Sequence, residues 1–243
     1  MLEPDTETFS RPTYTKMPGL TSQPAGEDIY HVILTSSHFK RDPNSEIQKV
    51  RVCGTYTSIK SAKAEAHRTL FDAGYEREWF KVFDARTHDT TSWKHGDGVI
   101  VYAEAPEGET FTVSIYTAKD TLGVKSNDLD KIEIDLYHIL QTTIFYDKDA
   151  SGGMRETSIQ GTFKTYGEAR AAATSLLLNK EDGMTKGSWD EYDELPVGER
   201  DGEYGENVVV HAIGSNGENV VLSVVKEQEL EALRVLEAAM RLR

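Results

Sequence analysis

The feature that most constrains this chain is a short pattern that occurs twice, 107 residues apart. Gly54-Thr55-Tyr56 precedes one stretch with helical spacing, and Gly161-Thr162-Phe163 precedes another. The flanking positions keep the same offset, since Asp28-Ile29-Tyr30-His31 corresponds to Asp135-Leu136-Tyr137-His138. Self-similarity at a fixed offset is typical of repeated structural units, so we expect an internal duplication.

Each unit is expected to begin with two antiparallel strands and a helix. Residues Ile29 to Thr35 are rich in β-branched and aromatic side chains on both faces, which indicates a strand covered on both sides. We expect the second strand at 50–56, antiparallel to the first. Apolar residues spaced by three and four then predict a helix over 58–73, whose alanines allow a close approach to the sheet. In the second unit, Thr165 and Glu168 have the spacing of a helix capping box.

Strands are expected to complete each unit. The first unit has a candidate strand at 79–84 and a hairpin of 99–103 with 111–116 across Pro106-Glu107-Gly108. The second unit has the same hairpin, of 208–213 with 220–225, across an Asn-Gly turn. The segment 189–192 is a poor match to the strand at 79–84, which favours a loop there. The sequence therefore predicts an α+β protein of tandem β-β-α-β-β-β repeats, each an antiparallel sheet packed by one helix.

The chain is predicted to have five parts. These are a flexible tail (1–26), a first α+β repeat (27–119), a linker (120–134), a second α+β repeat (135–226) and a C-terminal amphipathic helix (227–243). We expect the repeats to pack about a pseudo-twofold axis, through a shared sheet or through the apolar faces of their first strands. The last helix is expected to cover a sheet face, with homodimer formation as the alternative use.

The charge distribution restricts the partners. Net charge is −14, of which −2 lies in 27–119 and −11 lies in 120–243. Such a second half repels phosphate backbones, so we expect no nucleic acid and favour a protein partner with a basic surface. No apolar run reaches the roughly 20 residues that span a membrane. The acidic start predicts no secretion, and a single cysteine, Cys53, agrees with a reducing compartment, so we expect a cytoplasmic protein.

The preserved pairs Tyr30-His31 and Tyr137-His138 are the candidate ligand-binding residues. Near a pseudo-twofold axis, the two histidines could line a shared pocket. The alternative is that each imidazole is hydrogen-bonded within its strand and has a structural role. No carboxylate or cysteine stands at ligand spacing from them, so we expect neither a metal ion nor a cofactor.

Two further polar segments are candidates for chemistry. His88-Asp89 and His95-Gly96-Asp97 lie in one loop with Trp93, and the second repeat has nothing comparable. We interpret this segment as a solvated loop. The range 190–206 is densely acidic but lacks the residue order of an EF-hand, so we interpret it as a second solvated loop that could bind a basic peptide.

The sequence contains no nucleophile elbow or phosphate-binding glycine pattern, and Cys53 is expected to be a buried, inert thiol. We therefore expect no catalytic residues. The leading prediction is a non-enzymatic protein-binding or scaffold protein. The alternative is a small-molecule-binding protein or an enzyme whose site lies between the repeats near His31 and His138.

Overall fold

The computed structural model describes residues 28–37, 49–87, 93–146, 148, 150, 155–179, 181–199 and 201–228. The tail predicted at 1–26 lies outside these residues. The same holds for the predicted C-terminal helix, apart from Glu227 and Gln228, which follow the last strand and are not helical. Among the described residues, no helix is long and apolar enough to cross a membrane.

The first half forms a five-stranded antiparallel sheet with the strand order β2-β1-β5-β4-β3. Helix α1 packs on it. The elements are β1 (Asp28–Ser37), β2 (Lys49–Tyr56), α1 (Ile59–Asp72), a short 3-10 helix (Arg77–Trp79), β3 (Val82–Ala85), β4 (Val99–Glu104) and β5 (Thr110–Lys119).

The second half forms another five-stranded antiparallel sheet, with the order β7-β6-β12-β11-β8 and helix α2 against it. Its elements are β6 (Tyr137–Phe145), β7 (Arg155–Phe163), α2 (Tyr166–Leu176), a short 3-10 helix (Lys186–Ser188), β8 (Glu191–Glu194), β11 (Val208–Ile213) and β12 (Glu218–Lys226). A two-stranded ribbon, β9 (Asp201–Gly202) with β10 (Gly205–Glu206), stands between β8 and β11 in the chain.

The predicted α+β class and both hairpins are confirmed, whereas two predictions for the edge strands need correction. The first-half strand expected at 79–84 begins only at Val82, because a 3-10 helix ends at Trp79 and residues 80–81 connect it to the strand. The prediction of a loop at 189–192 was wrong, since β8 begins at Glu191 and pairs with β11. An edge strand has one hydrogen-bonded neighbour and tolerates charged side chains, so β8 lacks an apolar pattern.

Both helices lie on their sheets through alanine-rich stripes. Ala62, Ala66 and Leu70 of α1 are almost fully buried, as are Ala169 and Ala173 of α2. Helix α1 ends at Asp72, and Gly74 follows its C-cap residue with a φ of 93°, in the left-handed region that glycine tolerates best. The first turn of α2 contains half of the predicted capping box, because the Thr165 hydroxyl accepts a hydrogen bond from the backbone N–H of Glu168.

A β-bulge accompanies each copy of the Gly-Thr-aromatic pattern. The pairing of β1 with β2 shifts between Val32 and Ile33, and that of β6 with β7 shifts between Ile139 and Leu140. In each case the aromatic ring two residues after the glycine covers it, so a Cβ would lie 2.9 Å from the ring at Gly54. The pattern thus combines a bulge with a ring that leaves no room for a side chain.

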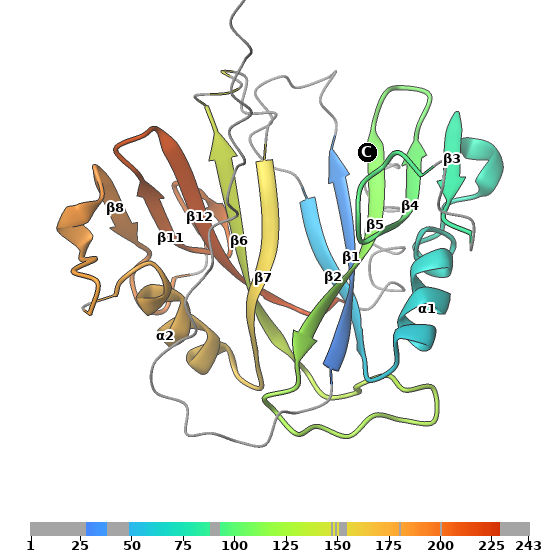
Figure 1. The fold of residues 1–243 in the computed structure, drawn as a ribbon, viewed down its shortest axis with the longest axis horizontal. Coiled ribbons are helices and arrows are strands. Elements are labelled where there is room, and N and C mark those ends of the chain that lie inside the picture. Colours follow the sequence, from blue (N-terminus) through green and yellow to red (C-terminus); the bar gives the residue numbers. More distant parts are fainter. Residues whose placement is uncertain are drawn as a thin grey trace, which may run out of the picture.

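The two sheets are separate and pack against each other through the faces opposite to their helices. Ile33 and Val52 from the first sheet form one cluster with Leu140 and Ile159 from the second. Figure 1 shows α1 and α2 on the outer sides of the two sheets. The order of layers is therefore helix, sheet, sheet, helix, with the first strands β1 and β6 at the interface.

The segment 120–134, which was predicted as a linker, is packed against the first half. Lys131 forms an isolated bridge with Tyr56, and the Asp130 carboxylate accepts a hydrogen bond from Ser61 of α1. Ile132 is 1% exposed and contacts a small cluster with Ile29 and Leu136. These contacts place the segment beside the N-terminal ends of β1 and β6.

Candidate functional site

The predicted histidine pair lies at the interface between the two sheets. His31 comes from β1 and His138 from β6, and neither side chain has any exposed surface. Their ring centroids are 5.0 Å apart, with the edge of one ring toward the face of the other. The structure therefore brings together the two histidines that the sequence pattern had paired.

A chain of hydrogen bonds connects the two imidazoles to a carboxylate. The Thr55 hydroxyl donates to Glu227 Oε2 at 2.8 Å, so its oxygen accepts from His31 Nδ1 at 2.9 Å. This leaves His31 Nε2 as an acceptor, which the Thr162 hydroxyl approaches at 3.4 Å. His138 Nδ1 donates to the same hydroxyl oxygen at 3.1 Å. The chain thus runs from one sheet to the other in a single donor-to-acceptor direction.

The surroundings of the pair keep His31 uncharged. Burial, and next the charge of His138, lower the pKa of His31 to about 3. His138 Nε2 is buried without a hydrogen-bond partner among the described residues and lies 3.8 Å from Glu227 Oε2. The contact between the two rings and the hydrogen bond from Thr162 to His31 Nε2 connect the two sheets.

The two tyrosines of the predicted site do not join the histidines. Tyr30 packs against the core between its sheet and α1, and Tyr137 packs against the corresponding core under α2. Successive side chains of a strand point to opposite faces, so a tyrosine next to an interface histidine points to the helix side.

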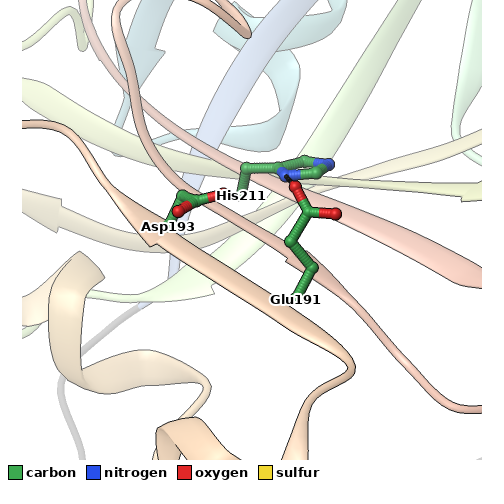
Figure 2. A group of neighbouring side chains, drawn as sticks. All are labelled: Glu191, Asp193 and His211. Atoms are coloured by element: carbon green, nitrogen blue, oxygen red, sulfur yellow. Dashed lines mark ion pairs between the residues drawn. The ribbon is translucent and has the colours of Figure 1, made fainter.

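A second cluster, which sequence reasoning missed, lies on the outer strands of the second sheet (Figure 2). Glu191 and Asp193 project from the edge strand β8, and His211 projects from the neighbouring strand β11. One potential ligand atom from each residue lies within 4.8 Å of the other two. We call these three residues the carboxylate–histidine cluster.

In the His211 imidazole, one ring nitrogen has a hydrogen-bond partner and the other has none among the described residues. His211 Nε2 lies 3.1 Å from the side-chain oxygen of Asn219, an acceptor, so Nε2 is the protonated nitrogen. His211 Nδ1 then carries a lone pair. It lies 3.8 Å from Glu191 Oε1 and has no hydrogen-bond partner in the described part of the chain, although the side chain is only 5% exposed.

Tyr204 holds the cluster together from the loop between β9 and β10. Its ring stacks on His211 with a centroid distance of 3.9 Å. Its hydroxyl lies 2.8 Å from Asp193 Oδ2 and 3.0 Å from Glu191 Oε1. The hydrogen bond to Asp193, followed by burial and the Glu191 carboxylate, raises the pKa of Tyr204. One hydroxyl proton is thus shared by two carboxylates.

A cavity of about 340 Å³ opens beside this cluster. Acidic side chains and an apolar wall line it together: Asp193, Glu194, Glu199, Glu203, Leu195, Pro196, Val208 and Val209, with Tyr204 and His211 at the cluster. No Lys or Arg among the described residues forms an ion pair with Glu191 or Asp193. We call this space the acidic cavity.

The first half has a related but different group at the matching place in its sheet. His95 Nε2 lies 2.7 Å from Asp84 Oδ2, and the His95 ring stacks on Tyr102 at 4.1 Å. The pairing of Asp84 with Tyr102 matches that of Asp193 with His211. The histidine and the tyrosine have therefore exchanged positions between the halves, which corrects the expectation that the second half has nothing comparable.

The other residues predicted in that first-half loop are only partly described. Trp93 contacts His95 edge to face and donates a hydrogen bond to the backbone oxygen of Gly96, whereas His88 and Asp89 lie outside the described residues. Val82 stands where the second half has Glu191. In the described part of the first-half group, the one carboxylate at the position of the cluster is Asp84, and it is already bonded to the His95 imidazole.

No protein-family model matches the sequence, and comparisons with curated proteins and with solved structures also give no match. The fold defines an α+β protein of two facing sheets, each with a helix on its outer face.

Proposed function

We propose that this chain is a non-enzymatic binding protein formed by duplication of one α+β unit. In this proposal the first half is a support, and the acidic cavity of the second half receives a positively charged group from a protein partner. The observation that carries the proposal is the concentration of carboxylates around a cavity with an apolar wall.

Three likenesses between the halves support the duplication. The strand orders β2-β1-β5-β4-β3 and β7-β6-β12-β11-β8 agree element by element. The bulges fall at positions 107 residues apart, and the pairing of β3 with β4 matches that of β8 with β11 at an offset of 109. Chance resemblance of two sheets does not require agreement in register.

The chemistry of the acidic cavity suits a lysine or arginine side chain. Such a side chain has an apolar stem and a charged end, and the cavity offers Leu195 and Val208 beside Glu199 and Glu203. The excess of acid in 120–243 would also attract a basic partner surface over a longer range. Both features favour a protein partner with exposed basic residues.

A ligand site between the halves, near His31 and His138, is the alternative. The complete burial of both rings and their hydrogen bonds to Thr55 and Thr162 favour a structural role for the pair instead. The cavity in the second half is open to ligands without any rearrangement of the interface.

Calorimetric titration with a hexalysine peptide tests the proposal. We expect the double variant Glu199→Gln/Glu203→Gln to bind about tenfold more weakly, since two exposed ion pairs contribute about 1.4 kcal/mol together. The control Glu76→Gln/Glu78→Gln removes the same charge from exposed positions of the first half and should change the affinity less than about twofold. Equal losses in both variants would indicate general charge attraction and overturn the proposal.

A further inference from the structure

We propose that Glu191, Asp193 and His211 bind a divalent transition-metal ion of the zinc or manganese class. This inference goes beyond the proposed function, because it requires no protein partner. It rests on a buried imidazole nitrogen and two carboxylates that lie close together (Figure 2), with one ligand atom of each residue within 4.8 Å of the other two.

The strongest observation is the free nitrogen of His211. A histidine that ligates a metal commonly donates its other ring N–H to an oxygen acceptor, which fixes the tautomer and directs the lone pair. His211 has this arrangement, with Nε2 held by the Asn219 oxygen and Nδ1 unpartnered among the described residues, although the side chain is 95% buried. A buried acceptor without a partner is costly, and a bound cation removes that cost.

The spacing of the donors needs only a small adjustment. Zinc bonds of about 2.1 Å in tetrahedral geometry place ligand atoms roughly 3.4 Å apart. The distance from His211 Nδ1 to Glu191 Oε1 is 3.8 Å, and all three ligand atoms fall within 4.8 Å. Glu191 and Asp193 are both exposed on the edge strand, and changes in the side-chain torsions of both would bring the set to bonding distance.

The two negative charges at the cluster also favour the binding of a cation. Glu191 and Asp193 lie close enough to share the hydroxyl of Tyr204, which has a single proton to donate. Two neighbouring carboxylates repel each other, and a divalent ion between them replaces that repulsion with attraction. Tyr204 is then a positioning residue, which orients the carboxylates through its hydroxyl and the imidazole through its ring.

The donor set selects the class of metal. Calcium and magnesium prefer oxygen ligands alone, whereas a set of one imidazole and two carboxylates suits zinc or manganese. Three protein ligands leave a coordination position, which water can fill from the acidic cavity.

The first half supplies a natural control. Asp84 occupies the place of Asp193, but Val82 replaces Glu191 and Tyr102 replaces His211. The imidazole present there, His95, already bonds to Asp84. Asp84→Asn therefore removes a matched carboxylate without touching the proposed ligands.

The test is calorimetric titration of the untagged, full-length, EDTA-treated protein with ZnCl₂ and MnCl₂, with native mass spectrometry for stoichiometry. We expect one ion per chain, and at least a tenfold loss of affinity in Glu191→Gln and in Asp193→Asn. Asp84→Asn should bind like the parent protein. Zinc should also raise the Tm of the parent but not that of Glu191→Gln. Cooperative melting of this variant without metal, at a Tm close to that of the parent, shows that it is folded.

Three outcomes would overturn the metal site: no saturable binding by the parent protein, unchanged binding in Glu191→Gln, or equal loss in Asp84→Asn. If metal binding fails while the hexalysine result holds, the metal site is rejected and the proposed function stands. If Glu199→Gln/Glu203→Gln, and not the cluster variants, loses the metal, the cation sits at the rim and the ligand assignment is wrong.

Discussion

Acid should destabilise this protein through His31, and removal of that imidazole should remove a defined part of the acid sensitivity. The pKa of His31 is about 3 in the folded protein and about 6.5 in an unfolded chain. The unfolded chain therefore binds the proton more tightly. This contribution leaves stability at its full value above pH 6.5, and lowers it progressively as the pH falls from about 6.5 to about 3.

The size of the effect follows from the two pKa values. At pH 4.5 the unfolded chain is protonated at this position and the folded protein is not. The pH lies about 2 units below the unfolded pKa, so the free energy of unfolding falls by about 2.7 kcal/mol relative to neutral pH. His31 is fully enclosed, so solvent screening reduces this value little.

The variant His31→Asn retains an N–H group that can donate to Thr55 but cannot titrate. Urea unfolding of both proteins at pH 7.5 and pH 4.5 gives the loss of stability on acidification for each. The loss should be smaller by about 2.7 kcal/mol in the variant. Any packing defect is present at both pH values and cancels. The rings that contact His31, those of His138 and Tyr116, are unchanged, as is Glu227, which bonds to Thr55.

The matched control is His67→Asn on α1, whose imidazole is only partly buried. Its loss on acidification should differ from that of the parent by much less than that of His31→Asn. If His31→Asn and the parent protein lose the same stability between the two pH values, the enclosed neutral imidazole is not the acid-sensitive group, and the reasoning fails.

Three other predictions follow from local geometry. Gly161→Ala should destabilise the protein by about 1–3 kcal/mol in urea unfolding, because its Cβ would lie 2.8 Å from the ring of Phe163. The control Gly167→Ala in α2 places its Cβ where nothing lies within 4 Å, so it should stabilise the protein by up to about 1 kcal/mol. Thr165→Ala should lower the free energy of unfolding by about 1 kcal/mol, because the N-cap hydrogen bond of α2 is lost. Ser58→Ala should lower it by less than about 0.5 kcal/mol, because the Ser58 side chain makes no cap hydrogen bond with any described residue. Cys53 is 2% exposed and burial raises its pKa to about 12, so a disulfide reagent at pH 8 should label it only after unfolding; rapid labelling of the native protein would contradict its burial.

The helices and central strands could be predicted because their apolar periods reflect burial directly. Strand β1 is apolar on both faces since one face meets α1 and the other meets the second sheet. The edge strand β8 could not be predicted in this way. Of its four residues only Tyr192 is partly buried, and its three acidic residues gave the same signal as a solvated loop.

The histidine pair was accessible from sequence because both members keep the same offset and neighbours. The carboxylate–histidine cluster was not. Glu191 and Asp193 were predicted to lie in a loop, and His211 joins them only through the pairing of β8 with β11. The exchange of histidine and tyrosine between the halves also hid the relation of Tyr204 and His211 to His95 and Tyr102.

On the proposals above, only the second half carries a cation site. Paramagnetic broadening by substoichiometric Mn²⁺ in two-dimensional ¹H–¹⁵N spectra of the full-length protein tests this claim directly. We expect the strongest loss of signal at β8, Tyr204 and β11, with the amides around Asp84 and His95 unaffected. Broadening centred on the first-half group, or spread evenly over the acidic surface of the second half, would contradict it.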